Sequence, residues 1–163
     1  MVTIAGAKTE RSSGAARETA ARCVMAMDYG RKRIGLAVAD EAGGVARPLA
    51  TIERKNRRED LRRLREIVRE QGVKTIVVGH PLRMDGTRGE MAAETERFAE
   101  RLRKQIGVPV ELVDERLTSW EAEQLLSKKK GKKKKHEGYE VDAVAAAVIL
   151  RDCLERKKTG ERG

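Results

Sequence analysis

The order of the apolar segments constrains the fold of this chain more than any other feature of its sequence. Three strand-length apolar runs come first, at residues 23–28, 34–39 and 46–52. The first two runs flank a basic, glycine-containing turn, which predicts a β-hairpin, and the third run is expected to extend it into a three-stranded antiparallel meander. The chain then changes to helix-length segments that alternate with single strand-length runs.

The second part of the chain predicts helices that cover this sheet, because apolar residues recur there at intervals of three and four. The predicted elements are a helix at 57–71, a strand at 73–79, a helix at 90–106, a strand at 108–113 and helices at 118–126 and 140–154. A chain of 163 residues has the length of one domain. We therefore expect a single α/β domain: a mixed sheet, made of the antiparallel meander plus parallel strands, flanked by helices.

The charge balance predicts a polyanionic partner. The sequence has 36 Lys and Arg against 26 Asp and Glu, so its formal net charge is +10. Such an excess points first to nucleic acid and second to an anionic membrane surface. Aromatic residues make up only 2% of the chain, which argues against a base-stacking platform of the RRM or OB type.

Other features exclude several classes of protein. The longest apolar run, at residues 143–150, is far shorter than the ~20 residues that a membrane span needs. Cys23 and Cys153 are far apart in sequence and form no CxxC pair, so neither a disulfide framework nor a zinc cluster is predicted. Two such cysteines fit a reducing compartment, and we expect a cytoplasmic protein with no membrane partner.

The surplus positive charge is concentrated outside the predicted core. Residues 1–21 lack a sustained apolar period and predict a disordered extension, which we prefer to an organellar transit peptide. Residues 22–155 are predicted to form the folded domain, with a mobile lysine-rich loop at 127–138, and residues 156–163 a charged tail. The lysines of the loop are Lys128, Lys129, Lys130, Lys132, Lys133, Lys134 and Lys135. We expect these segments to give a flexible hold on nucleic acid that is largely independent of base sequence.

Two aspartates stand where a carboxylate is costly to bury. Asp28 closes the first apolar run, where it either forms the hairpin turn or serves a functional site. Asp142 opens the last predicted helix, and its helical neighbours Ala145, Ala146 and Ile149 are apolar, so its face should pack inward. Its carboxylate then needs a partner, either the amides of the first helical turn or a metal ion.

A third acidic position follows the last predicted strand, where Asp114 and Glu115 precede Arg116. Ligands of open α/β sheets gather at the carboxyl ends of parallel strands. Because adjacent residues of a strand point to opposite faces, at most one of the two carboxylates should reach a given site. The other would be solvated, or one of them would pair with Arg116.

Together, Asp28, Glu115 and Asp142 predict a catalytic site that binds metal. Three converging carboxylates would repel one another unless a cation held them, and oxygen ligands without His or Cys favour Mg²⁺ or Mn²⁺. Such sites hydrolyse phosphodiesters with two metal ions. In this hypothesis Asp28 bridges the two ions, and Glu115 and Asp142 each complete one site. The residues expected to hold the phosphate backbone are Arg31, Lys32 and Arg33 and the lysines of the loop.

Four segments of the chain are together similar to the YqgF/RuvX family. They read MAMDYGRKRIGLAVAD, VGHPLRMDGTRGEMAAETERFAERL, VELVDERLTSWEAEQLL and VDAVAAAVIL, and they span about residues 23–154 in the family's order. The family comprises RNase H-like proteins described as Holliday junction resolvases and as pre-16S rRNA nucleases. The resemblance therefore implies an RNase H-like mixed sheet and a nuclease activity.

The resemblance also implies roles for individual residues. Carried over position by position, the family's acidic site falls on Asp28, on Glu115 of the DER string and on Asp142, with Arg116 in a supporting position. One departure is His80, where the family pattern has an apolar residue. We interpret it as a histidine at the rim of the site, in preference to a substrate contact.

The function predicted from these observations is a metal-dependent nuclease that matures the 5′ end of pre-16S rRNA during ribosome biogenesis. The alternative is a Holliday junction resolvase of DNA recombination and repair, which shares the chemistry and should act as a homodimer. The oligomeric state stays open. A further alternative is a protein that binds nucleic acid without catalysis. An actin-like phosphotransferase is disfavoured, because the chain is too short for a second lobe and Gly35 is followed by Leu36 and not by a Walker A lysine.

Overall fold

The described residues of the computed structural model are 22–115, 135–136, 139–158 and 160. Most of the strands form one five-stranded sheet, in the order β3-β2-β1-β4-β5. Its strands are β1 (Cys23–Tyr29), β2 (Arg33–Asp40), β3 (Arg47–Glu53), β4 (Val73–His80) and β5 (Val110–Asp114). The first three strands form an antiparallel meander, and β4 and β5 run parallel to β1. The predicted mixed α/β sheet is therefore confirmed.

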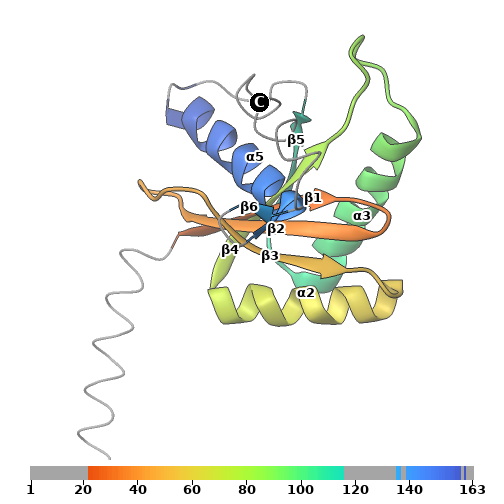
Figure 1. Cartoon of the computed structure of the whole chain (residues 1–163), viewed down its shortest axis with the longest axis horizontal. Helices are drawn as coiled ribbons and strands as arrows, with labels where there is room; N and C mark the ends of the chain where they lie inside the picture. Colours follow the sequence, from red (N-terminus) through yellow and green to blue (C-terminus); the bar gives the residue numbers. More distant parts are fainter. Residues whose placement is uncertain (1–21, 116–134, 137–138, 159, 161–163) are drawn as a thin grey trace, which may run out of the picture.

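Helices cover both faces of this sheet (Figure 1). α2 (Arg57–Gln71) and α3 (Glu90–Ile106) pack on one face. α5 (Val141–Lys158) crosses the other face, where it packs on β2, β1 and β3. The sheet is thus the middle of three layers, and residues of one strand reach two separate cores.

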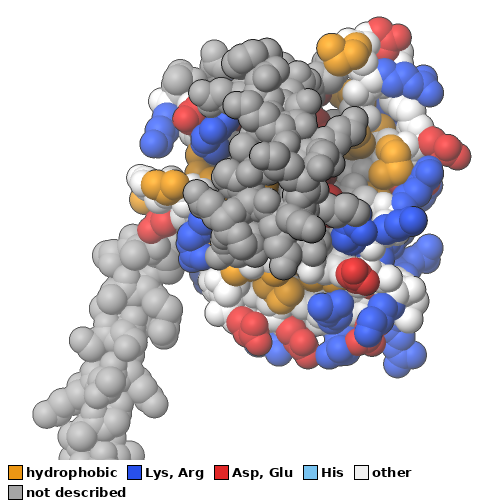
Figure 2. All heavy atoms as spheres, viewed as in Figure 1, with side chains coloured by type: hydrophobic (Ala, Val, Ile, Leu, Met, Phe, Trp, Pro, Cys, Tyr) orange, Lys and Arg blue, Asp and Glu red, His pale blue; other side chains and the backbone are white. Residues whose placement is uncertain are grey.

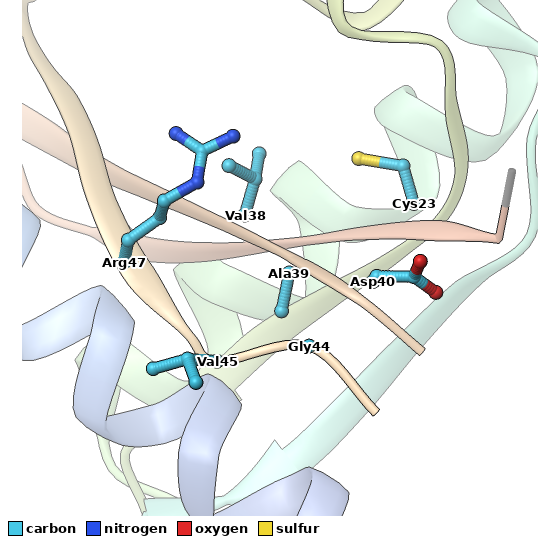
Figure 3. Close-up of a pocket in the computed structure, with 7 residues that line it drawn as sticks. All are labelled: Cys23, Val38, Ala39, Asp40, Gly44, Val45 and Arg47. Carbon is cyan, nitrogen blue, oxygen red and sulfur yellow. The ribbon is translucent and has the colours of Figure 1, made fainter. Parts of the chain in front are cut away.

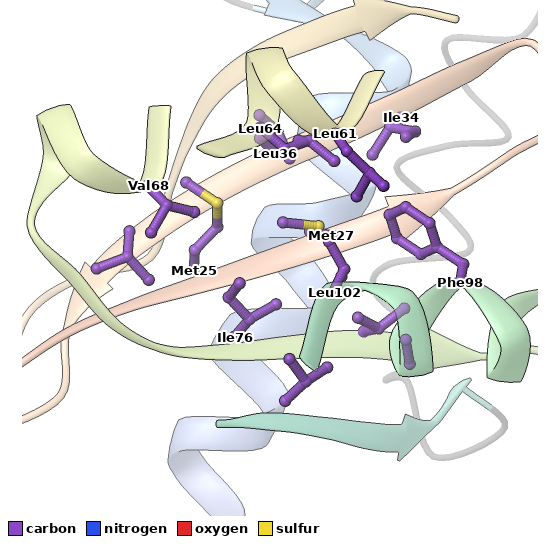
Figure 4. Close-up of a cluster of buried hydrophobic side chains, with 14 of the residues drawn as sticks. Met25, Met27, Ile34, Leu36, Leu61, Leu64, Val68, Ile76, Phe98 and Leu102 are labelled. Atoms are coloured by element: carbon purple, nitrogen blue, oxygen red, sulfur yellow. The ribbon is translucent and has the colours of Figure 1, made fainter. Parts of the chain in front are cut away.

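Successive side chains of β1 point alternately into the two cores. Met25 and Met27 are fully buried beneath α2 and α3, together with Leu64 and Phe98 of those helices (Figure 4). Val24 and Ala26 point the other way, into the cluster under α5. A strand buried on both faces reads as a continuous apolar run, which is why the 23–28 segment shows no alternation in the sequence.

Two element boundaries differ from the sequence prediction by more than one residue. α5 continues to Lys158, because the basic side chains of its last turn interact favourably with the carboxyl end of the helix dipole. The first three residues of the predicted charged tail are therefore helical. β5 begins at Val110, two residues later than predicted, because Pro109 has no N–H for the ladder and only its carbonyl pairs, with the N–H of Ile76.

Other predicted segments lie partly or wholly outside the described residues. β6 (Lys135–His136), near the end of the predicted lysine-rich loop, pairs with β7 (Tyr139–Glu140), which follows that loop. The helix predicted at 118–126 and the extension predicted at 1–21 are not among the described residues. Within the described part of the chain, no helix is long and apolar enough to cross a membrane. Both cysteines are free thiols, as the sequence predicted.

Candidate active site

Asp28 lies near the carboxyl end of β1 and faces α5. Its strand neighbours Val24 and Ala26 are in the cluster under α5, and alternation places Asp28 on the same face. On one side Asp28 is paired in register with Gly35 of β2. On the other side it is one step beyond the pairing of Met27 with Val78, and therefore beside Gly79 of β4. Asp28 thus has a glycine on each neighbouring strand.

Gly35 allows the start of α5 to lie directly on the sheet. A β-carbon at this position would overlap the carbonyl oxygen of Asp142 and stand 2.8 Å from the amide nitrogen of Ala143. No side chain is compatible with that approach of two backbones. The first turn of α5, and with it Asp142, is therefore held next to the strand pair that carries Asp28.

Gly79 leaves corresponding room for Glu115. A β-carbon there would overlap the carboxylate of Glu115 and stand 2.9 Å from Cδ1 of Ile149, a residue of the cluster under α5. Asp114 is instead the register partner of His80, whose side chain contacts α3 through Glu96. Alternation therefore directs Asp114 toward the α3 face and Glu115 toward the Asp28 face. Of the two neighbouring carboxylates, the structure therefore places Glu115 on the side of Asp28.

The electrostatics of Asp28 reflect this crowding. The pKa of Asp28 is raised from 3.8 to about 8, first by burial and then by the negative charges of Glu115 and Asp142. Burial also raises the pKa of Glu115, whereas the nearby His80 lowers it. Carboxylates that disfavour each other's ionisation are typical of sites that bind cations or exchange protons.

The raised pKa of Asp28 predicts how the stability of the metal-free chain depends on pH. Between about pH 4 and pH 8 the folded chain keeps a proton on Asp28 that the unfolded chain has lost. The contribution of this group to the free energy of unfolding is therefore complete below about pH 4 and is lost as the pH rises through about 8. Melting temperatures measured in EDTA across this range should fall more for the wild type than for Asp28→Asn. If the melting temperatures of the two proteins change with pH in the same way, Asp28 does not have a raised pKa.

Arg33 pairs with Asp142, the third predicted acid. Its Nε donates to a carboxylate oxygen of Asp142 at 2.9 Å, and both side chains are about one third exposed. This ion pair neutralises one of the two negative charges that act on Asp28. It also fixes where the Asp142 carboxylate points, which a helix-capping role for Asp142 would not require.

The donor set fits a hard divalent cation, although the side chains are not arranged as a closed cage. Among the described residues, no three His, Cys, Asp or Glu side chains stand together in a geometry that would hold a metal ion. Glu115 and Asp142 nevertheless lie close enough to Asp28 that their negative charges add to the effect of burial in raising its pKa. A divalent cation would remove the repulsion among these carboxylates, and carboxylate oxygens are the ligands that Mg²⁺ and Mn²⁺ prefer.

His80 lies at the end of β4 with most of its side chain buried. Its Nε2 is 2.7 Å from a carboxylate oxygen of Glu96, and Arg88 forms a forked ion pair with the same carboxylate. A histidine held by α3 in this way is consistent with the interpretation of His80 as a rim residue. Glu96 and Arg88 were not singled out from the sequence, because only the tertiary fold brings them to His80.

The residues predicted to hold nucleic acid are differently placed. Arg31 forms a forked ion pair with Glu94 of α3, with contacts of 2.7–3.2 Å, and Arg33 pairs with Asp142. Lys32, between them, is exposed. The residues that lie outside the described part of the chain are Arg116, Lys128, Lys129, Lys130, Lys132, Lys133 and Lys134, and Lys135 is in β6.

A cavity of ≈ 300 Å³ lies at the opposite end of β1 from Asp28 (Figure 3). Cys23, Asp40 and Arg47 are among its lining residues. Cys23 pairs in register with Asp40, five pairs away from the pairing of Asp28 with Gly35. This cavity is therefore separate from the cluster of carboxylates.

Comparisons with known proteins agree with the fold and with the sequence pattern. The sequence model of the RuvX family, described as Holliday junction resolvase, matches residues 22–156. A protein of Anaeromyxobacter sp. (strain K) named "Putative pre-16S rRNA nuclease" is 48% identical over 133 residues, which are 82% of this chain and 96% of that protein. A protein of the same name from Thermosynechococcus vestitus is 40% identical over 134 residues, which are 82% and 88% of the two chains.

Among solved structures, "T. thermophilus RuvC in complex with Holliday junction substrate" is similar to this chain with a TM-score of 0.53 and 17% identity. The match covers 85% of this chain and 96% of that one. A likeness at this level of identity concerns the fold, and it confirms the predicted RNase H-like arrangement of sheet and helices.

Proposed function

The chain belongs to the RuvX family, and from this membership we propose that it is a divalent-metal-dependent nuclease that matures the 5′ end of pre-16S rRNA. One structural observation carries the proposal: Asp28 lies between two strand glycines that make room for Glu115 on one side and Asp142 on the other. The relatives named for this activity match the chain over most of its length.

The roles of the residues follow from their positions. Asp28, Glu115 and Asp142 would hold the divalent cations, which when bound supply Lewis acidity and an activated water for phosphodiester hydrolysis. The ion pair with Arg33 keeps the Asp142 carboxylate oriented before substrate arrives. Burial of Asp28 reduces competition from bulk water around the acids. The basic residues of the β1–β2 turn, Arg116 and the lysine-rich run would hold the substrate backbone.

A second candidate function is the resolution of four-way DNA junctions, because the matching family is described as Holliday junction resolvase. The acidic site would serve either substrate, since hydrolysis of RNA and DNA phosphodiesters needs the same ligands. A resolvase would in addition be expected to act as a dimer that cuts two strands symmetrically.

Cleavage of matched substrates tests this proposal. The purified chain is given, with Mg²⁺ or Mn²⁺, a precursor 16S rRNA fragment that contains the mature 5′ end and, separately, a four-way DNA junction. We expect cutting of the rRNA fragment that depends on the metal and stops in EDTA. Cutting of the junction alone would favour the second function, and cutting of neither by the folded protein would contradict both.

The lysine-rich run is expected to contribute salt-dependent, sequence-independent affinity. Removal of one phosphate contact should reduce the slope of log affinity against log salt by about 0.7 for single strands and about 0.9 for duplex. Replacement of residues 128–135 by a Gly/Ser segment of equal length should therefore flatten this slope in an anisotropy titration with RNA. An unchanged slope would exclude the run from the interface.

A further inference from the structure

A second cavity lies on the sheet face opposite Asp28. It has a volume of ≈ 220 Å³ and is bordered by β1, α2 and α3. Its lining residues are Tyr29, Arg54, Arg57, Glu94, Arg97 and Arg101, which we call the arginine pocket. Figure 2 shows basic side chains gathered over α3 and the neighbouring amino-terminal end of α2, the region that this pocket occupies.

One wall of the arginine pocket is fixed by hydrogen bonds and packing. Nη1 of Arg54 donates to the hydroxyl of Tyr29 at 2.8 Å, and its guanidinium lies 4.8 Å from the centre of the Tyr29 ring. The Tyr29 ring in turn stacks on Phe98 at 4.4 Å, and Asp60 accepts from Nε of Arg54 at 3.1 Å. Arg54 is therefore neutralised and held in place by protein groups alone.

Among the described residues, the other three arginines of the pocket lack such partners. Within the described part of the chain, Arg57, Arg97 and Arg101 have no ion pair with any acid. Glu94, the one acid of the lining, is already engaged by Arg31 through both of its carboxylate oxygens. The pocket thus carries more positive charge than its own acids neutralise.

Arg101 shows what this imbalance does to a partly buried group. Its Nε is buried with no hydrogen-bond acceptor among the described residues. Burial lowers the pKa of Arg101, and the positive charges of Arg57, Arg54 and Arg97 lower it further. A buried donor without an acceptor and a cluster of like charges are both unfavourable, and one bound anion would relieve both.

We propose that the arginine pocket binds a phosphate group of the nucleic-acid substrate, at a position away from the cleaved bond. This inference rests on the proposed function. Tyr29 directly follows Asp28 in β1, so the pocket and the acidic site share one edge of the sheet but open on opposite faces.

The size and chemistry of the pocket fit this ligand. Its volume is below the roughly 300–1,000 Å³ of sites that enclose a drug-sized ligand, so it suits a single charged group of a longer chain. The planar guanidinium fork matches the geometry of phosphate oxygens and reads no base sequence.

The first test measures binding of the anion without any nuclease activity. Melting temperatures of the wild type, Arg101→Gln and Arg69→Gln are compared in inorganic phosphate and in chloride at equal ionic strength. Arg69 is an exposed arginine near the far end of α2, so its variant loses the same charge outside the pocket. We expect phosphate to raise the melting temperature of the wild type and of Arg69→Gln, but not that of Arg101→Gln. Equal shifts in all three proteins would overturn the pocket as an anion site.

The second test identifies the source of the phosphate. In anisotropy titrations with a single-stranded RNA, the slope of log affinity against log salt should fall by about 0.7 in Arg101→Gln and stay unchanged in Arg69→Gln. Arg97→Gln, a substitution at an exposed position, should lower the slope in the same way and covers the case in which Arg101→Gln does not fold. If free phosphate stabilises the wild type but neither pocket variant changes the slope, the pocket takes a small anion and the proposal is wrong.

Failure of this inference and failure of the proposed function give different results. Both tests report binding, and neither needs turnover. If the wild type cleaves precursor rRNA but the salt slope is unchanged in both pocket variants, the proposed function stands and the pocket proposal is wrong. If the wild type cleaves neither substrate but the salt slope is reduced in both pocket variants, the proposed function is wrong and the pocket remains a nucleic-acid contact.

Discussion

Asp28→Asn is expected to abolish cleavage of precursor rRNA while the chain stays folded. The substitution keeps the shape of the side chain and removes the charge that Glu115 and Asp142 oppose. Loss of even an outer-shell partner of a metal ligand typically costs about 10–100-fold in metal affinity or activity, so loss of the central carboxylate should cost more than about 100-fold. The measurement is the initial rate of cleavage at saturating Mg²⁺.

The control for this variant is its stability. Because a neutral amide is easier to bury than a crowded carboxylate, Asp28→Asn should melt at the same temperature as the wild type or higher in EDTA near pH 8. A variant that is inactive and also strongly destabilised would show a structural role for Asp28. A variant that is folded and active would remove Asp28 from the catalytic site.

Gly35→Ala is expected to disrupt the fold at the point where α5 meets the sheet. Its β-carbon would overlap the backbone of Asp142, which cannot move aside as a side chain does. Overpacking of a core costs about 1–3 kcal/mol, and a clash of backbone atoms should reach or exceed the upper end of this range. For a domain of this size that cost corresponds to a fall of roughly 6–12 °C in melting temperature.

Gly79→Ala is the matched comparison for Gly35→Ala, because the new β-carbon would meet side-chain atoms and not backbone atoms. Its β-carbon would displace the carboxylate of Glu115 and crowd Cδ1 of Ile149. We expect a smaller fall in melting temperature than for Gly35→Ala, together with a clear loss of cleavage. Gly43→Ala, which has open space around it, should change neither quantity. Equal melting temperatures for all three variants would contradict the close contact of α5 with β2.

The sequence alone predicted the order of elements because each carries its own pattern. The apolar runs of β1 and β2 are continuous since both strands are buried on both faces, and the helical period of α2 follows from one buried side. Boundaries set by single residues were less well predicted. Pro109 makes β5 begin later, and the basic last turn of α5 extends that helix. Neither effect can be predicted from the spacing of apolar residues.

The acidic residues could be named from the sequence, but their surroundings could not. Strand alternation indicated that only one of Asp114 and Glu115 should reach the site, and the structure adds the register of His80 with Asp114 and the space above Gly79. The pairing of Arg33 with Asp142 joins residues 109 positions apart, a contact that no local pattern encodes. The arginine pocket was missed for the same reason, since its residues come from β1, α2, α3 and the β3–α2 connection.

The neighbouring carboxylates Asp114 and Glu115 offer the most direct test of the acidic site. Cleavage of the precursor rRNA fragment is measured at saturating Mg²⁺ for Asp114→Asn and Glu115→Gln, with melting temperatures to confirm that both variants fold. Asp114→Asn should keep activity within a few-fold of wild type, whereas Glu115→Gln should lose more than about 100-fold, because Glu115 and not Asp114 faces Asp28. Loss of activity in Asp114→Asn with normal cleavage by Glu115→Gln would contradict this assignment.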